Sequence, residues 1–362
     1  MIKEPCISVI IPFFNAEAHL NKCLKSLMEQ DISEPFEILL INDCSTDNSL
    51  EVIENFNFPN IKIFALEKNS GPSAARNKGI EKAKGEYLFF LDADDSILKE
   101  TLNILFKKAK TENINLVFCD KKRIEGSFNN RDNIFAYFSD KDFSKSDIIE
   151  EIKKRVSDPN HSLGVIGCHG KLIKYSILLE NNIKFEEKLR FMEDEIFMID
   201  VLGCSNKVSY IRKQLYIYNI NPTISSGRSE AFNHIFPTSN FKIMSSHVKK
   251  SFLRKSCSID VANKYEKQAL IYYVIYTLIS YSLSIFRGKI NLKKGLEQRK
   301  KILKEIVNDK DISEAVKSYS ISKDESKWIP RAISLKSYLF LEFFCNLRAK
   351  QLIKKIKKNK NI

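Results

Sequence analysis

The sequence predicts an α/β fold in which a mostly parallel, Rossmann-like sheet flanked by helices is followed by a helical C-terminal region. Three observations predict this arrangement. Short apolar runs alternate with segments of helical periodicity over the first 120 residues, which is typical of a parallel, right-handed sheet. Polar residues follow each apolar run, where the predicted strand ends. From about residue 230 the pattern becomes helical and strongly basic.

The predicted elements follow one another at regular spacing. Residues 7–11 read as a strand that Pro12 ends, and residues 20–28 have the i, i+3, i+4 apolar spacing of a helix. The same alternation then predicts strands at 37–42, 61–66, 87–91 and 115–119, with helices through 50–53, from 72 and over 97–109.

Length and composition limit the class of protein. The 362 residues allow one large domain or two ordinary ones, and a hydrophobic content of 43% predicts a sizeable core rather than disorder. Eight cysteines without Cys-x-x-Cys spacing indicate reduced thiols rather than a disulfide framework or a zinc site. The first strand begins by residue 7 without the layout of a signal peptide, so we expect a cytoplasmic protein.

The net charge of +14 is unevenly distributed along the chain. Residues 241–362 contain 28 Lys and Arg against 10 Asp and Glu, whereas residues 1–240 contain 31 against 35. This asymmetry predicts two parts with different tasks, residues 1–225 and residues 226–362. The basic part could face nucleic acid or an anionic membrane surface.

Three carboxylates follow the apolar run 87–91, which has no polar face. Ligands of open α/β sheets bind just outside the carboxyl ends of strands, where Asp92, Asp94 and Asp95 stand. If the extended conformation continues, Asp92 and Asp94 point to the same side and can share Mg²⁺ or Mn²⁺. The alternative is an ordinary turn in which Asp95 or Ser96 caps the next helix.

Other predicted strand ends add an aromatic ring, a carboxylate and an arginine to the same rim. Phe14 could stack on a base, Asp43 could accept the imide N–H of uracil, and Arg76 could neutralise phosphate. Taken singly, Asp43 and Asp47 are better explained as turn and cap residues, and Arg76 as a surface cation; their joint appearance at one rim argues otherwise. No glycine-rich dinucleotide motif or P-loop follows the first strand.

Four ordered motifs resemble the signatures of family 2 glycosyltransferases, which have the GT-A fold. They are SVIIPFFN from Ser8, INDCSTDNS from Ile41, NSGPSAARNKG from Asn69 and FLDADD from Phe90. Two later stretches fit the same family. FMEDEIF from Phe191 is similar to the Glu-Asp element that follows the donor half in many members. YIYNINPTIS from Tyr216 resembles the strand and turn that end the catalytic domain in capsule and lipopolysaccharide enzymes. The resemblance covers roughly residues 5–220.

The resemblance implies an inverting transferase that moves a sugar from a nucleotide-sugar, most often a UDP-sugar, to an acceptor hydroxyl. Asp92 and Asp94 would hold Mn²⁺ or Mg²⁺, with Asp94 the firmer ligand. Asp194 would be the general base, although the sequence alone does not separate it from Glu193 or Glu195, and the acidic triplet could merely complement a helix N-terminus. The implied nucleotide-sugar contacts are Pro12, Phe14, Asn15, Asp43, Asp47, Asn69, Arg76 and Asp92.

Two departures from the family pattern affect the expected contacts. Phe14 replaces the common Tyr, which removes a hydroxyl and keeps the ring. His169 stands where many relatives carry Trp, which leaves the acceptor contacts open; His169 and Lys171 are acceptor candidates, or else a loop residue and a solvated cation. The polar stretch 121–160 is expected to include a loop over the cleft.

Two C-terminal segments raise the question of membrane contact. Residues 270–286 lack charge and reach the short limit for a membrane span, but their hydroxyls favour a buried core helix or a membrane-surface helix. The aromatic block 338–344 precedes a polybasic tail, a pattern that suits docking on the cytoplasmic face of an anionic inner membrane. The alternative is a solvated basic tail.

These patterns together predict a glycosyltransferase that builds a bacterial surface glycan on a glycan or lipid-linked glycan acceptor. A non-catalytic scaffold on the same fold is the main alternative, and whether Asp92, Asp94 and Asp194 converge on one cleft discriminates the two. A sugar nucleotidyltransferase would need a glycine-rich loop after the first strand, and a nucleic-acid binder would explain only the basic part. The absence of a Gln-x-x-Arg-Trp element argues against a processive synthase.

Overall fold

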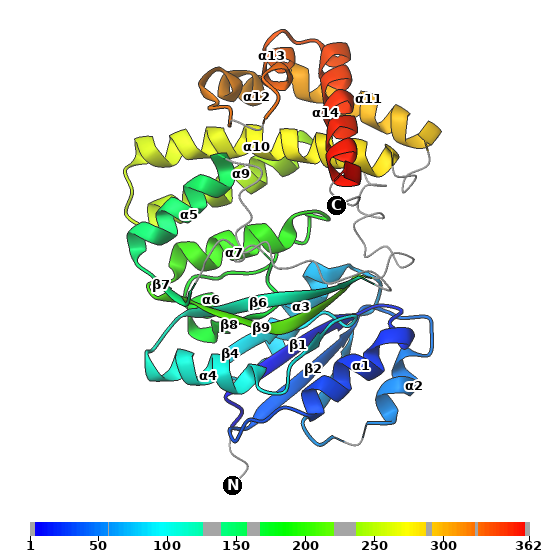
Figure 1. Cartoon of the computed structure of the whole chain (residues 1–362), viewed down its shortest axis with the longest axis vertical. Coiled ribbons are helices and arrows are strands. Elements are labelled where there is room, and N and C mark those ends of the chain that lie inside the picture. Colours follow the sequence, from blue (N-terminus) through cyan, green and yellow to red (C-terminus); the bar gives the residue numbers. More distant parts are fainter. Residues whose placement is uncertain are drawn as a thin grey trace. The chain divides into compact units, whose positions relative to one another are not determined.

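The computed structural model describes residues 4–56, 58–125, 139–157, 167–220, 237–286, 292–322 and 325–358. The chain forms two compact units, Met1–Ile148 with Ser162–Ile224 and Ile149–His161 with Ser225–Ile362 (Figure 1). The first unit holds the sheet and the second is helical. Residues 149–161 thus group with the helical unit, although the predicted division at 225 assigned them to the first part.

Parallel strands form the first half of the sheet. β1 (Ile7–Phe13) pairs with β2 (Phe36–Asn42) on one side and β4 (Tyr87–Phe90) on the other, and β2 pairs with β3 (Ile61–Ala65). These are the strands that the apolar runs predict, within one residue or two at each end. Pro12 does not end β1, however, since β1 continues through it to Phe13. Because all four are parallel, their carboxyl ends share one edge of the sheet.

The second half of the sheet is mixed. The full order is β3-β2-β1-β4-β8-β6-β9-β5, with β7 also on β9. Its strands are β5 (Ser96–Ile97), β6 (Leu116–Glu125), β7 (Lys141–Phe143), β8 (Lys171–Lys174) and β9 (Val208–Ile220). β6 and β9 are parallel, whereas β8 runs antiparallel between β4 and β6, and β5 and β7 are antiparallel to β9. The parallel prediction therefore holds for two blocks that antiparallel β8 joins.

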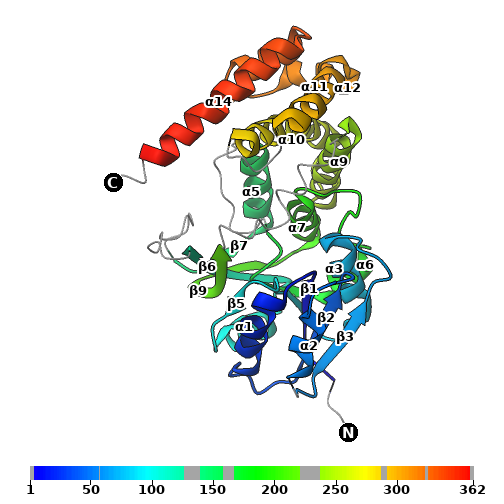
Figure 2. The ribbon, with the colours of Figure 1, turned by 90° about the vertical axis from the view of Figure 1, so that its right-hand side faces the viewer.

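Helices flank the sheet of the first unit (Figure 2). They are α1 (Glu17–Met28), α2 (Ser49–Glu54), α3 (Pro72–Lys82), α4 (Thr101–Thr111), α6 (Tyr175–Glu180) and α7 (Glu193–Cys204). The helix predicted over 97–109 begins later than expected, because Ser96 and Ile97 pair with β9 as β5. α3 begins as predicted at Pro72, after Gly71 with φ of 89°. α3 also packs closely on β1, since a Cβ at Gly79 would lie 2.3 Å from Ile10 Cγ2.

The stretch 121–160 is more regular than the sequence suggests. Residues 121–125 continue β6, and α5 (Lys145–Ser157) is a helix of thirteen residues. Any loop over the cleft would fall in 126–138 or 158–166, outside the described residues. The turn predicted after β9, in 221–225, also lies outside them.

The helical unit is organised around one long buried helix. α10 (Ile259–Phe286) is accompanied by α9 (Thr238–Arg254), α11 (Leu292–Asn308), α12 (Lys310–Ala315), α13 (Trp328–Ser334), α14 (Tyr338–Lys358) and the 3₁₀ turn Val316–Ser318. α10 is long and apolar enough to cross a bilayer, with a mean hydropathy of 1.7, yet 72% of its apolar window is buried inside the protein. It therefore packs as a core helix, one of the two alternatives expected for residues 270–286.

α5 contributes to this helical unit from an earlier part of the sequence. Figures 1 and 2 both show α5 beside α9 and α10. Ile152 and Val156 are buried, and the Arg155 guanidinium lies 5.1 Å from the centroid of the Tyr272 ring. The chain therefore enters the helical unit twice.

Candidate functional site

The chain turns immediately after β4, at the edge where the parallel strands end. The N–H of Asp95 donates to the carbonyl of Asp92 at 3.0 Å, which closes a turn. The condition that the extended conformation continues through Asp92 and Asp94 is therefore not met. The carboxylates of Asp92 and Asp94 are still close enough to repel each other. This repulsion, together with burial, raises the pKa of Asp94 to about 6. This excess of negative charge favours a cation or a proton at the turn.

The third carboxylate of the turn points into the protein. Asp95 is fully buried and accepts hydrogen bonds from the Tyr216 hydroxyl at 2.6 Å and from the N–H of Asn219 at 2.9 Å. The Tyr216 hydroxyl also accepts from the N–H of Asp92 at 3.3 Å. Neither Asp95 nor Ser96 caps a helix, so that alternative is wrong; Asp95 instead joins the turn to β9.

Arg76, on the second turn of α3, is buried beneath the carboxylates rather than exposed. Its Nη2 lies 3.0 Å from Asp92 Oδ1, and its Nη1 lies 3.6 Å from Glu193 Oε1. The guanidinium also lies 5.4 Å from the centroid of the Phe185 ring. Because only 7% of Arg76 is exposed, the interpretation as a surface cation is wrong. Arg76 compensates negative charge from two elements far apart in the sequence.

The acidic triplet begins α7, as predicted, directly after Met192 in the left-handed conformation with φ of 63°. The three side chains differ in their surroundings. Glu193 faces Arg76, and burial together with the charge of Asp194 raises its pKa to about 7. Asp194 Oδ1 accepts the N–H of Glu195, and Glu195 itself is buried. Glu193 and Asp194 thus remain the two candidates beside the site.

The two acceptor candidates have different environments. His169 Nδ1 lies 3.8 Å from Asp92 Oδ2, and its ring stacks on Tyr218 with centroids 5.8 Å apart. His169 therefore belongs to the site. Lys171 is fully buried, with its Nζ 3.4 Å from the carbonyl of His169, so the interpretation as a solvated cation is wrong. Its role toward the acceptor stays a prediction.

Lys121 is a site residue that the sequence analysis missed. It lies on β6 opposite Tyr216, where the register shifts on either side of Asp120, and its Nζ lies 5.9 Å from the centroid of the Tyr216 ring. β-Bulges of this kind redirect side chains near active sites. Burial lowers the pKa of Lys121 to about 8, and the charges of Asp194 and Asp92 oppose that shift, which shows that both carboxylates are near. No sequence signal marks the bulge; the position after a predicted strand end was the only indication.

The loops after β1 and β2 are held together by hydrogen bonds. The N–H of Asn15 donates to Ser45 Oγ at 3.0 Å, and Asn15 Oδ1 accepts the N–H of Thr46 at 2.8 Å. Asp47 accepts the N–H groups of Glu17 and Ser49 at 3.0 and 3.1 Å, as a turn residue does, whereas the N-cap of α2 is Asn48. These bonds rigidify the loops that present Phe14.

The remaining predicted nucleotide contacts lie on the same side of the sheet. Phe14 is 45% exposed, so its ring is available for stacking, and Pro12 is half-buried beside it. Asp43 accepts the N–H groups of Ser70 and Gly71 at 2.7 and 2.8 Å, so it holds the loop before α3. A carboxylate has about four acceptor sites, so Asp43 can still accept one more donor. Asn69 is exposed on that loop.

The residues at the turn fit a divalent cation only together with a ligand. Among the described residues, no group of three or more His, Cys, Asp and Glu side chains forms a preformed metal site. Asp92 and Asp94 supply two hard oxygen donors, and the raised pKa of Asp94 shows uncompensated charge there. Mg²⁺ and Mn²⁺ commonly take two carboxylates and complete their coordination with phosphate oxygens. The donor set is consistent with that arrangement.

Comparisons with known proteins bear on this site. Residues 8–178 match the family model described as glycosyl transferase family 2. TarS of Staphylococcus aureus, a poly(ribitol-phosphate) β-N-acetylglucosaminyltransferase, is 28% identical over 66% of this chain and 39% of its own length, so the chain spans well under half of that relative. TarP of the same species, which is also named a poly(ribitol-phosphate) β-N-acetylglucosaminyltransferase, is 33% identical over 59% of this chain and 62% of its own length. The cholesterol galactosyltransferase of Borreliella burgdorferi is 28% identical over 92% of both chains.

A solved structure shows the same fold. The crystal structure of S. aureus TarS residues 1–349 in complex with UDP superposes with a TM-score of 0.68, covering 95% of this chain and 91% of that one at 21% identity. The same TarS fragment in complex with UDP-GlcNAc has a TM-score of 0.66. The sheet with its helical C-terminal region is therefore the GT-A architecture of that enzyme.

Proposed function

Because residues 8–178 match the family model of glycosyl transferase family 2, we propose that this chain transfers a sugar from a UDP-sugar, with inversion, to a hydroxyl of a bacterial surface-glycan acceptor. One observation carries the proposal: Arg76, Asp92 and Glu193 meet at the strand ends, with Asp94 in the adjoining turn. A non-catalytic scaffold has no need to hold these charges together at a cost in stability. Relatives that bind UDP or UDP-GlcNAc support the choice of donor.

The proposed reaction forms one bond and breaks another. The acceptor oxygen bonds to the anomeric carbon from the face opposite the diphosphate, and the bond from that carbon to the diphosphate oxygen breaks. UDP leaves, and the acceptor proton passes to a carboxylate that acts as general base. We assign that role to Asp194, which lies in the first turn of α7 and whose charge acts on the ammonium of Lys121. Glu193 is held by Arg76 and is better suited to positioning.

Asp92 and Asp94 are the residues that would hold Mn²⁺ or Mg²⁺. When bound, the ion would stabilise the negative charge that develops on the leaving UDP. Arg76 orients Asp92, because its guanidinium contacts that carboxylate directly. The Tyr216 hydroxyl fixes the backbone of the turn, because it accepts the N–H of Asp92 and donates to the Asp95 carboxylate. Arg76 thus positions the Asp92 carboxylate, and Asn219 Nδ2 holds the backbone carbonyl of Asp94 at 2.8 Å.

The base end of the donor would lie over the loops after β1 and β2. Phe14 offers an exposed ring for stacking, and Asp43 offers a remaining acceptor site for an imide N–H. Lys121 and His169 would face the sugar or the acceptor, since both lie beside the Tyr216 ring and His169 Nδ1 lies 3.8 Å from Asp92 Oδ2. We propose a cytoplasmic site of action on a glycan or lipid-linked glycan acceptor.

A thermal-shift titration tests the donor site. UDP, GDP and CDP are each added with and without Mn²⁺ to the wild type, to Asp94→Asn and to Asp31→Asn, an exposed aspartate that serves as the control. We expect UDP with Mn²⁺ to raise the melting temperature of the wild type and of Asp31→Asn, and the gain to disappear in Asp94→Asn. If no nucleotide shifts the melting temperature of the wild type, the donor site is wrongly assigned and the scaffold alternative is favoured.

A further inference from the structure

α14 is apolar on two opposite sides. Leu341, Cys345 and Ala349 recur every four residues and are fully buried in the helical unit. Leu339, Phe343 and Leu347 recur with the same spacing two positions away, which is about 200° around a helix. These three are 42% to 61% exposed. A helix that is apolar on both sides needs a second apolar environment on the side that the protein does not cover.

The neighbouring helix α13 extends this exposed surface. Trp328, the only tryptophan of the chain, is 53% exposed and stacks on Phe344 with ring centroids 5.5 Å apart at 13°. Leu335, directly after α13, and Phe340, on α14, are also more than half exposed. We call these residues the apolar face: Trp328, Leu335, Leu339, Phe340, Phe343 and Leu347. Such a patch is larger than the single exposed hydrophobic residues that are normal on a protein surface.

Positive charge surrounds the apolar face. Residues 327–362 contain ten Lys and Arg against one acidic residue, Glu342. Lys327, Arg331 and Lys336 come from α13 and its flanks, and Lys350 and Lys354 are exposed on α14. The Arg331 guanidinium lies 5.7 Å from the centroid of the Trp328 ring, so cation and aromatic ring are adjacent. Part of the polybasic tail, residues 355–362, lies beyond the described side chains.

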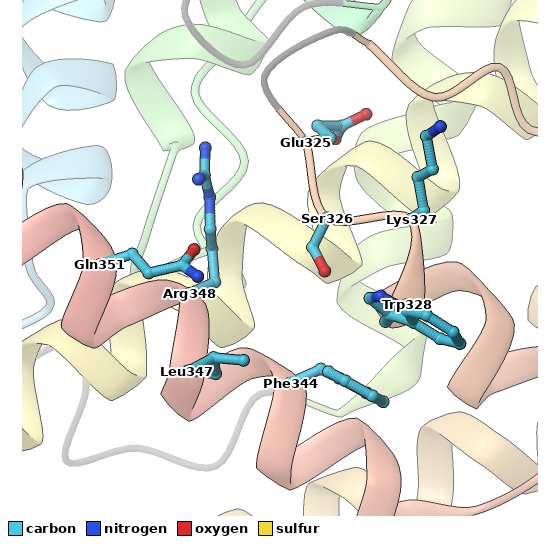
Figure 3. Close-up of a pocket in the computed structure, with 8 residues that line it drawn as sticks. All are labelled: Glu325, Ser326, Lys327, Trp328, Phe344, Leu347, Arg348 and Gln351. Carbon is cyan, nitrogen blue, oxygen red and sulfur yellow. The ribbon is translucent and has the colours of Figure 1, made fainter.

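A groove beside Trp328 combines both properties. It has a volume of about 400 Å³ and is lined by residues that precede α13 and by one side of α14 (Figure 3). Trp328, Phe344 and Leu347 supply apolar wall, and Lys327 and Arg348 supply cationic groups. Figure 3 shows the Trp328 and Phe344 rings side by side, with Arg348 and Gln351 further along α14. An apolar wall with cations at its border suits an acyl chain below a phosphate headgroup.

We propose that the apolar face of α13 and α14 docks the protein on the surface of an anionic lipid bilayer. Trp328, Leu339 and Phe343 would enter the boundary between headgroups and acyl chains, and the flanking Lys and Arg would contact lipid phosphates. Tryptophan favours this boundary because its ring is apolar and its N–H is polar. A second copy of the chain is a less suitable occupant, because a symmetric contact would bring two strongly basic surfaces together.

Vesicle binding of the full-length chain, without any sugar or nucleotide, tests this proposal independently of the transferase reaction. Flotation with phosphatidylcholine vesicles is compared with flotation on vesicles containing about 30 mol% phosphatidylglycerol. The variants are Leu339→Ser with Phe343→Ser, and Leu179→Ser as a matched control, because Leu179 on α6 is 62% exposed and Leu339 is 61% exposed. Thermal unfolding of each variant verifies that its fold is retained.

We expect the wild type and Leu179→Ser to float with anionic vesicles, and to a smaller extent in high salt. The double variant should bind these vesicles at least about tenfold more weakly. Fluorescence of the single Trp328 should shift to shorter wavelength on anionic vesicles and be quenched by lipids brominated on their acyl chains. Absence of vesicle binding, equal binding by the double variant, or an unshifted Trp328 emission would overturn the proposal. Concentration-dependent dimerisation that the double variant abolishes would overturn it in favour of a second copy.

Discussion

Replacing Arg76 by Met tests whether the buried charges at the strand ends form one unit. Arg76→Met keeps much of the side chain's volume and removes its positive charge, which leaves Asp92 and Glu193 facing each other without compensation. Loss of one partner from a buried ion pair typically costs 3–5 kcal/mol. The Asp92 side chain is 24% exposed, so we expect a loss near the lower end, about 3 kcal/mol in the free energy of unfolding.

The pH dependence of this loss follows from the charges. Burial and Asp194 already raise the pKa of Glu193 to about 7, and removal of Arg76 raises it further. The carboxyl can then relieve the repulsion by taking up a proton, which happens more readily at low pH. The destabilisation should therefore be smaller at pH 6 than at pH 8.

A double-mutant cycle in urea denaturation measures the coupling. Arg76→Met, Glu193→Gln and the double variant are compared with wild type in metal-free buffer, and Arg190→Met is the control because Arg190 is an exposed arginine that donates to the carbonyl of Ser70. We expect Glu193→Gln to restore about 1–2 kcal/mol to Arg76→Met, and Arg190→Met to cost under about 0.5 kcal/mol. A cost below about 1 kcal/mol for Arg76→Met, or strictly additive effects, would refute the argument that these charges act together.

Three further predictions concern the same site. Tyr216→Phe removes the hydroxyl that bonds Asp95 and the Asp92 backbone, so urea denaturation should show a loss of about 1.5–3 kcal/mol; a loss below about 0.5 kcal/mol would contradict that role. Lys121→Met should raise the KM for the UDP-sugar about fivefold or more and leave stability equal or higher, because it removes a half-buried ammonium whose pKa desolvation lowers; lower stability with unchanged KM would indicate a purely structural lysine. Because the pKa of Glu193 is raised in the folded protein, its contribution to stability is complete below about pH 4.5 and is lost as pH rises to about 7. The unfolding free energy of the metal-free protein should fall across this window, and Glu193→Gln should flatten the fall.

Local signals predicted the first half of the sheet and the residue types of the site. β1, β2 and β4 are short apolar runs followed by polar loops, and Gly71 with Pro72 marks the start of α3. Each of these elements can be predicted from its own stretch of sequence, without knowledge of the residues that pack against it. The family resemblance is confirmed by the comparisons, while the individual roles of Asp92, Asp94 and Asp194 stay predictions.

Contacts between distant parts of the chain explain what the sequence did not reveal. Asp95 turns inward because Tyr216, more than a hundred residues later, supplies its hydrogen bond. Arg76 is buried because α7 covers it with Glu193, and Lys121 reaches the site through a bulge that depends on the register of β6 against β9. Neither propensity nor periodicity in a short window contains this information.

The return of the chain into the helical unit has a consequence for how such proteins can be recombined. Residues 149–161 belong with 225–362, so the segment 1–224 is not a self-contained genetic module. A fusion or truncation made at residue 224 would leave Ile152, Val156 and the Arg155 guanidinium without the helices that bury them. Exchange of the helical unit between relatives would have to carry residues 149–161 along with the C-terminal part, which means two coordinated crossovers rather than one. Single-junction chimeras are therefore expected to be insoluble.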